Sequence, residues 1–183
     1  NGGDPALATQ LLQEAVAADS NFAMAWRKLS VVSRRALLPL SISLAASQKA
    51  YDLRDRLSPL EQQLAISNYY TSNAPDVDKA IAAYKAALEI DPNERTSLNN
   101  LALMYRSQGR WEDAEVMARR AAVVDRSWFS YGHLAFALAA QGRYTAADSA
   151  LKVLDSLTPG QPRGLQMEAL LRSAQGDYAG ADS

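Results

Sequence analysis

Histidine is the side chain that most often carries out acid–base chemistry at neutral pH, and it occurs once in this sequence, as His133. No Asp or Glu lies within one helical turn of His133, and the chain has no cysteine, so a metal site would have to be built mainly from carboxylates elsewhere. The pattern favours a structural or ligand-contacting histidine over a catalytic one. It also predicts that the chain holds no metal and no other cofactor.

The acidic residues offer no acid–base pair either. Asp52 and Asp55 flank Arg54 and Arg56 in the stretch YDLRDRL, so basic side chains lie close to both carboxylates along the chain. Opposite charges at such short spacings form local ion pairs on a solvated surface. We interpret this stretch as a polar surface, and the sequence predicts no enzymatic activity.

The charge balance disfavours several kinds of partner. The 183 residues include 19 Lys and Arg against 20 Asp and Glu, which gives a formal net charge of -1. A chain without a basic surplus has little electrostatic attraction for nucleic acid or for an anionic membrane. The longest apolar run, residues 36–46, is shorter than the roughly 18 residues that a spanning helix needs. The sequence therefore predicts no nucleic-acid partner and no membrane insertion.

One turn recurs along the chain at a nearly constant period. Three glycines, spaced 33 and 34 residues apart, are each followed two positions later by an aromatic residue: Gly109 by Trp111, Gly142 by Tyr144, and Gly176 by Tyr178. Glycine ends a helix because it adopts the left-handed conformation without strain, and the aromatic residue begins the next helix. Self-similarity at this period predicts a series of helical hairpins.

Other signals place the ends of the helices. Ser58, Pro59 and Glu61 are predicted to act as N-cap, first helical residue and capping-box residue. The repeat period is disturbed between about residues 37 and 58, where the usual glycine is missing and LLPLS, residues 37–41, is expected to form a longer turn. No stretch alternates with a period of two, so the predicted fold class is all-α. The expected helices are residues 5–18, 22–37, 42–57, 59–73, 76–90, 94–108, 111–124, 128–141, 144–157 and 163–175.

The stretch SLNNLALMYRSQGRWEDAEVMARRAAVVD, residues 97–125, resembles a tetratricopeptide repeat (TPR), whose signature is W-x-x-L-G-x-x-Y followed by spaced alanines. The matching positions are Leu98, Leu101, Ala102, Tyr105, Ala114, Ala118 and Ala121. This resemblance implies a right-handed α-solenoid of stacked helix-turn-helix hairpins. Small residues such as Ala102 opposite Ala114 would let the two helices of a hairpin approach closely.

On this resemblance the whole chain is a single TPR array, and it is expected to be a piece of a longer protein. The expected units are a half repeat at 4–20, full repeats at about 22–57, 59–93, 94–127 and 128–161, and a partial repeat at 162–183. Residues 50–106 are also similar to TPR regions of bacterial protein kinases of the eukaryotic type and of some regulators. The alternative function is therefore a regulatory or sensor segment. The cytoplasm is the favoured compartment, unless the parent is a membrane-anchored kinase.

The family resemblance implies a non-catalytic interaction module that holds a protein or peptide in a concave groove. Carried over position by position, the expected groove residues are Arg27, Arg34, Tyr69, Asn73, Asn99, Leu103, Arg106, Phe129, His133 and Phe136. Phe129, His133 and Phe136 form one helical stripe, and the alternative is that the two phenylalanines are buried against the adjacent hairpin. Val31, Ile66 and Thr96 stand where carboxylate-clamp repeats need Lys, Arg or Asn, which argues against C-terminal chaperone peptides. Self-association through uncapped ends is a further expectation.

Overall fold

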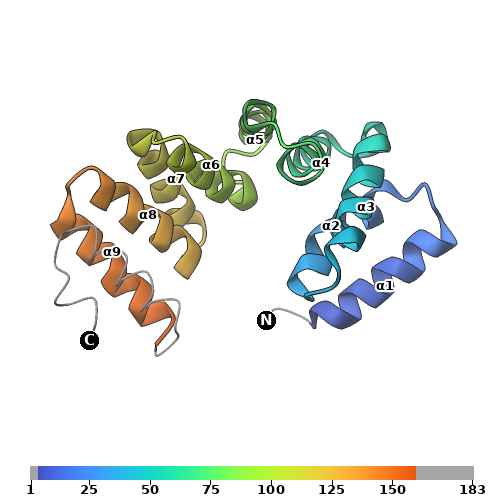
Figure 1. Ribbon diagram of the computed structural model, residues 1–183, viewed down its shortest axis with the longest axis horizontal. Helices are drawn as coiled ribbons and strands as arrows, with labels where there is room; N and C mark the ends of the chain where they lie inside the picture. The colour runs from blue at the N-terminus through green and yellow to red at the C-terminus, as the bar shows by residue number, and fades with distance from the viewer. Residues whose placement is uncertain (1–3, 160–183) are drawn as a thin grey trace. The chain divides into compact units, whose positions relative to one another are not determined.

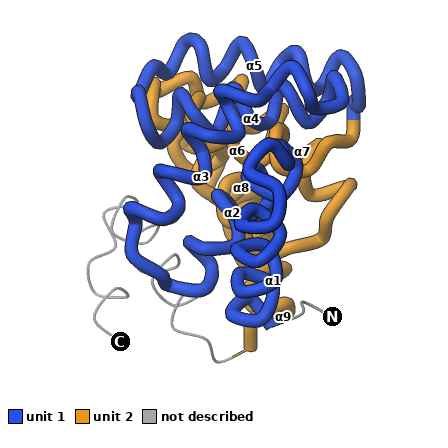
Figure 2. The backbone as a smooth tube through the Cα atoms, turned by 90° about the vertical axis from the view of Figure 1, so that its right-hand side faces the viewer, with its two compact units in different colours: residues 1–92 blue, residues 93–183 orange. Residues whose placement is uncertain are grey.

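The computed structural model describes residues 4–159, and within this range the regular structure is entirely helical (Figure 1). The expected fold class, an all-α solenoid of helical hairpins, is confirmed. The chain divides into two compact units, residues 1–92 and 93–183, which Figure 2 distinguishes by colour. The helix expected at 163–175 and the partial repeat expected at 162–183 lie outside the described residues.

The first unit consists of two helical hairpins and one further helix, α1. Helix α2 packs against α3, α4 packs against α5, and α1 lies against α2. Contacts between α3 and α4 join the two hairpins. The elements are α1 (Pro5–Ala18), α2 (Ala23–Arg35), α3 (Leu40–Asp52), the short 3-10 helix η1 (Arg54–Arg56), α4 (Pro59–Ser72) and α5 (Val77–Ile90).

The second unit contains two hairpins in its described part. Helices α6 and α7 form one, α8 and α9 form the other, and α8 contacts both α6 and α7 (Figure 1). The elements are α6 (Arg95–Ser107), α7 (Trp111–Val124), α8 (Trp128–Ala140) and α9 (Tyr144–Leu157). The repeat boundaries expected from the sequence stay a prediction.

Alanine occupies the positions where helices approach most closely. In unit 2 the core combines alanines that are almost completely buried with larger leucines, so the helices can pack backbone to backbone while leucine fills the remaining space. Unit 1 has a smaller core of the same type under α1. The residues are Ala102, Ala118, Leu134, Ala135, Leu138, Ala147 and Leu151 in unit 2, and Val16, Ala25, Leu29 and Ala46 in unit 1.

The start of α4 shows a local prediction that was confirmed and one that was wrong. Ser58 caps the helix by accepting a hydrogen bond from the N–H of Glu61, and Pro59 is the first helical residue, as expected. The capping-box role predicted for Glu61 is wrong, because its carboxylate forms ion pairs with Arg27 and Lys28 of α2 instead. The carboxylate of Glu61 thus connects α4 to α2 instead of capping its own helix.

The recurrent glycine turn closes each hairpin of unit 2 in the same way. Gly109 and Gly142 have φ values of 71° and 73°, in the left-handed region. In each turn the N–H after the glycine donates to the carbonyl five residues earlier, from Arg110 to Tyr105 at 2.9 Å and from Arg143 to Leu138 at 3.0 Å. This is the Schellman arrangement, which satisfies carbonyl groups at the end of the helix.

The turn between α2 and α3 uses the same closure without glycine. Leu37 has a φ of 55°, and the N–H of Leu38 donates to the carbonyl of Ser33 at 3.1 Å. The helix expected to run to residue 37 therefore ends at Arg35. The next helix begins at Leu40 and, where it was expected to reach residue 57, gives way to η1 after Asp52.

A buried carboxylate ties the two hairpins of unit 2 together. Glu115 of α7 is 8% exposed and accepts hydrogen bonds from Arg119 of its own helix at 2.8 Å and from Gln141 and Arg143 of the α8–α9 turn at 2.8 Å and 2.7 Å. Burial alone would raise the pKa of Glu115, but these three donors lower it below its usual value. The ionised carboxylate therefore fixes the turn relative to α7.

We expect Leu37→Gly to stabilise the protein. Leucine in the left-handed region is strained, and Leu37 is 91% exposed, so its side chain contributes little packing. Glycine removes the strain but makes the unfolded chain more flexible, which leaves a net gain of roughly 0.5 to 1 kcal/mol in the free energy of unfolding. Urea unfolding measures it. The control is Leu40→Gly in helical α3, which should not stabilise; equal effects of the two substitutions would contradict the explanation.

We expect Glu115→Gln to destabilise the protein by about 1 to 2 kcal/mol, because it removes a charge that two arginines and a glutamine share. The matched control is Asp148→Asn, which breaks the exposed ion pair with Lys152 and should change the free energy of unfolding by less than about 0.5 kcal/mol. Both are measured by urea unfolding of the whole chain. A loss for Glu115→Gln no larger than that of the control would show that the network contributes nothing beyond a surface ion pair.

Candidate functional site

The predicted groove residues of unit 1 are engaged in contacts within that unit. Arg27 pairs with Glu61, and Arg34 donates to the hydroxyl of Ser72 at 3.4 Å. The side-chain amide of Asn73 donates to the carbonyl oxygen of Leu44 on α3 at 2.8 Å. The side chains of these three predicted groove residues therefore already contact groups of their own unit.

Tyr69, the fourth predicted residue of unit 1, belongs to a tyrosine cluster that the sequence did not reveal. Its ring stacks on Tyr51 of α3 with centroids 4.0 Å apart, and Tyr70 meets both rings edge to face. The hydroxyls of Tyr51 and Tyr70 lie 3.2 Å apart. The adjacent tyrosines of α4 were a visible signal, but nothing in the sequence placed Tyr51 beside them. The cluster stabilises the contact between α3 and α4.

The six predicted residues of unit 2 lie on two neighbouring helices. We call this set the α6–α8 face: Asn99, Leu103 and Arg106 of α6, and Phe129, His133 and Phe136 of α8. On each helix the spacing is i, i+4, i+7, which places the three side chains on one side. Direct interactions between Arg106 and residues of α8 show that the two stripes adjoin.

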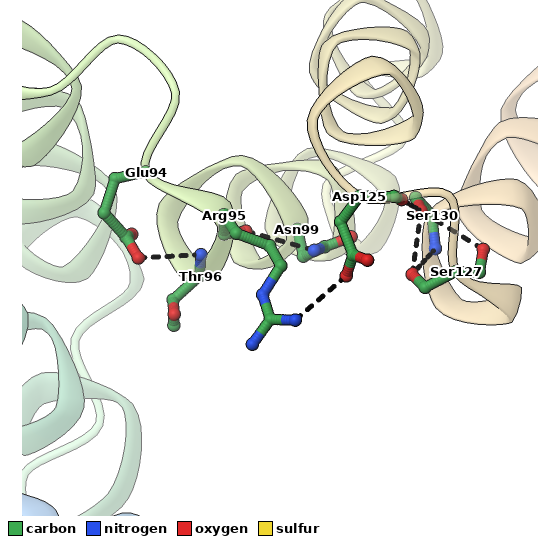
Figure 3. A network of polar contacts seen from close by, with 7 residues as sticks. All are labelled: Glu94, Arg95, Thr96, Asn99, Asp125, Ser127 and Ser130. Carbon is green, nitrogen blue, oxygen red and sulfur yellow. Dashed lines mark hydrogen bonds and ion pairs between the residues drawn. The ribbon is translucent and has the colours of Figure 1, made fainter. Parts of the chain in front are cut away.

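Polar contacts at their N-terminal ends hold α6 and α8 in register (Figure 3). Arg95, the first residue of α6, forms an ion pair with Asp125 at 3.1 Å, just before α8. Ser127 caps α8, and its hydroxyl lies 2.9 Å from that of Ser130, which also donates to the carbonyl of Asp125 at 2.7 Å. The amide of Asn99 donates to the carbonyl of Arg95 at 3.0 Å. The starts of both helices are therefore fixed.

Arg106 lies against an aromatic ring of the next hairpin. Its guanidinium carbon is 4.6 Å from the centroid of the Phe136 ring, a cation–π contact. Burial lowers the pKa of Arg106 below its usual range. Among the described residues no carboxylate forms an ion pair with this guanidinium, whereas Arg27 of α2 pairs with Glu61.

The two phenylalanines answer the question that the sequence left open. Phe129 is 39% exposed and meets His133 edge to face, with ring centroids 4.6 Å apart. Phe136 is partly buried beneath Arg106. Neither ring is part of the fully buried core, so both present some surface.

Asn99 and His133 were expected on an exposed surface, and that expectation is wrong. They are 9% and 7% exposed; the ring of Phe129 packs against His133, and the amide of Asn99 bonds to the backbone of its own helix. Within residues 4–159, neither of the ring nitrogens of His133 nor the side-chain oxygen of Asn99 has a hydrogen-bond partner. Burial, with a smaller contribution from the charge of Arg106, lowers the pKa of His133 to about 4. The imidazole is therefore neutral at physiological pH.

The described residues contain no group of three or more His, Cys, Asp or Glu side chains placed to hold a metal ion. None of the helices within residues 4–159 is long and apolar enough to cross a membrane. What the α6–α8 face does present is aromatic surface and one half-buried cation; the polar atoms of Asn99 and His133 that lack a partner in the described part of the chain are buried.

Comparisons with known proteins agree on the type of repeat. Family models of the tetratricopeptide repeat match residues 65–94 and 95–124, the second covering α6 and α7. Neither match points to the kinase or regulator parent that was the alternative expectation. No curated protein matches the sequence.

Solved structures similar to this chain include several bacterial proteins. PilW, a type IV pilus biogenesis factor, is 16% identical, with a TM-score of 0.73 over 99% of this chain and 90% of its own. A thermophilic TPR protein from Thermus thermophilus is 18% identical, with a TM-score of 0.66 over 91% and 88%. MamA is 18% identical, with a TM-score of 0.61 over 87% and 90%. Identities this low establish a shared fold and nothing about ligands.

We expect the His133 imidazole to titrate with a pKa of about 4, well below the usual 6.5. Because His133 is the only histidine, its ring gives a single set of NMR signals, and one titration of the chain measures its pKa directly. Arg106→Gln should raise this pKa without restoring 6.5, since burial is the larger cause. The control, Arg126→Gln at an exposed position in the same unit, should leave it unchanged. A wild-type pKa near 6.5 would show that the ring is not buried as described.

The low pKa of His133 also makes the stability of the protein depend on pH. The unfolded chain binds a proton near pH 6.5 while the folded chain resists protonation down to about pH 4, so acid favours unfolding between these values. His133 should thus cost up to roughly 3 kcal/mol of stability as the pH falls through this window.

Proposed function

The chain is an array of tetratricopeptide repeats, and from this premise we propose that it binds a segment of a partner protein across the α6–α8 face. Repeats of this kind support a role as a protein-interaction module, and such modules bind through preformed surfaces of adjacent helices. The repeat division expected from the sequence places α6 and α8 as the first helices of two successive hairpins. A segment lying across them would contact both.

The observation that carries this proposal is the composition of the α6–α8 face. Aromatic side chains and arginine contribute most of the binding energy at protein interfaces, and this face combines Phe129, Phe136 and Arg106 at partly exposed positions. The predicted residues of unit 1, by contrast, are occupied with contacts inside their own unit. The proposal therefore assigns binding to the second unit.

Rigidity of the two helices also supports the proposal. Arg95 and Asp125 join the starts of α6 and α8, and Glu115 holds the turn at the end of α8. A surface that keeps its shape loses less conformational entropy when a partner docks. The contacts around the face therefore favour binding without taking up the side chains that would make it.

The test is capture of partners from a lysate of the source organism, followed by binding of the purified partner. Three forms are compared: the unsubstituted chain, the double variant Arg106→Gln with Phe136→Ala, and a control double variant, Val123→Ala with Arg126→Gln. The control removes the same kinds of side chain from exposed positions of the same unit. Circular dichroism and urea unfolding establish that all three are folded.

We expect the unsubstituted chain and the control to bind the same partner. The face variant should bind it at least about tenfold more weakly, because it lacks two contacts at the centre of the proposed interface. Equal binding by the face variant would refute the α6–α8 face as the site. Capture of no protein by the unsubstituted chain would refute the proposed function itself.

A further inference from the structure

Several charged and polar side chains of unit 1 form pairs between its helices. In unit 1, Arg27 pairs with Glu61, and the amide of Asn68 donates to the hydroxyls of Ser30 and Ser47 at 3.0 Å each. These contacts join α2, α3 and α4 through groups of the unit itself. On the α6–α8 face, Arg106 has no carboxylate partner among the described residues, and Asn99 and His133 are buried with polar atoms unpaired; unit 1 has two such atoms as well, the hydroxyl of Ser33 and the side-chain oxygen of Asn73.

Arg106 is the first part of this contrast. A half-buried guanidinium loses hydration, and the face of an aromatic ring replaces only part of what a carboxylate would supply. Because the ring contact leaves the planar edge with its N–H donors available, an anion could be bound without breaking any ion pair described within the unit.

The second part is independent of the first. Buried polar atoms in proteins are nearly always hydrogen-bonded, and each exception needs an explanation. His133 and Asn99 are both more than nine-tenths buried, yet two imidazole nitrogens and one amide oxygen find no partner in the part of the chain that the structure describes. Arg106 acts electrostatically on His133 and covers Phe136 beside it, so displacing the Arg106 side chain would open the site to the imidazole.

We propose that the segment bound by the α6–α8 face is acidic, that one of its carboxylates pairs with Arg106, and that binding is coupled to proton uptake at His133. This inference rests on the proposed function and adds the chemistry of the partner and its dependence on pH. A carboxylate is the anion that fits, since recognition of phosphate groups generally uses clusters of arginines and this face has one.

The coupling follows from charge. Arg106 disfavours the protonated imidazole, and a carboxylate paired with Arg106 offsets that effect. Helices α6, α7 and α9 pack against α8, and of their charged groups Arg106 is the one that changes the pKa of His133. Tyr131 is the other titratable side chain of α8. The bound form therefore takes up a proton more readily than the free form. Affinity for an acidic segment should rise as the pH falls below about 6.5, down to the range of about pH 4 to 5 in which the carboxylates of the segment themselves take up protons.

The experiment selects binders from a displayed library of random-sequence peptides with the unsubstituted chain as bait. The most enriched peptide is then synthesised in two forms, as selected and with its acidic residues changed to the corresponding amides. Affinities are measured across this pH range for the unsubstituted chain, Arg106→Gln and the control Arg126→Gln. NMR follows the His133 titration with and without the peptide.

We expect the selected peptides to be enriched in Asp and Glu. The affinity should be about tenfold weaker for the amide peptide and for Arg106→Gln, because each change removes a charged hydrogen-bonded pair. Arg126→Gln should leave the affinity unchanged. The pKa of His133 should rise when the peptide binds. Selected peptides without acidic enrichment, binding insensitive to Arg106→Gln, or an unchanged His133 titration would overturn this inference and leave the proposed function standing. If no peptide is selected, the proposed function fails and this inference fails with it.

Discussion

The close approach of neighbouring helices through alanine is the constraint on which the rest of this structure depends. In unit 2 the almost fully buried Ala102, Ala118, Ala135 and Ala147 bring hairpin helices together, and such contacts tolerate nothing larger. Alanine contributes little apolar surface of its own, so leucines between the helices supply most of the hydrophobic stabilisation. Once the helices are fixed in this way, so are the positions of the side chains on their other faces.

Polar contacts at the two ends of α8 complete this arrangement. At the start, Ser127 and Ser130 cap the helix and Asp125 connects to α6; at the end, Glu115 holds the turn that Gly142 makes possible. Both sets of contacts are satisfied within the unit. Both ring nitrogens of His133, which have no hydrogen-bond partner among the described residues, lie in the middle of α8 between these fixed ends. A helix that could shift easily would move to pair or expose them, so their persistence depends on the anchoring at both ends.

Most of the fold could be predicted from the sequence because its signals are local. Proline, capping residues and glycine turns determined the ends of α1, α7 and α9 to the residue. The region after α2 was predicted least well: Leu37 takes a conformation that leucine rarely adopts, and no glycine or proline marks the end of α3. The closure of that turn depends on backbone hydrogen bonds that any residue could make, so its sequence carries no signal.

The candidate site could be predicted only in part, for the same reason. Helical spacing and the repeat pattern identified the stripe on α8, but burial of His133 depends on side chains that meet it from α6. Likewise, Arg34 and Arg106 occupy equivalent positions, eight residues after Trp26 and Leu98, and only the packing shows that one donates to the hydroxyl of Ser72 while the other lies over an aromatic ring. The predicted groove residues of unit 1 all make contacts inside that unit, whereas Arg106, Phe129 and Phe136 keep partly exposed surface. This difference is the reason for assigning stabilisation to the first set and recognition to the second.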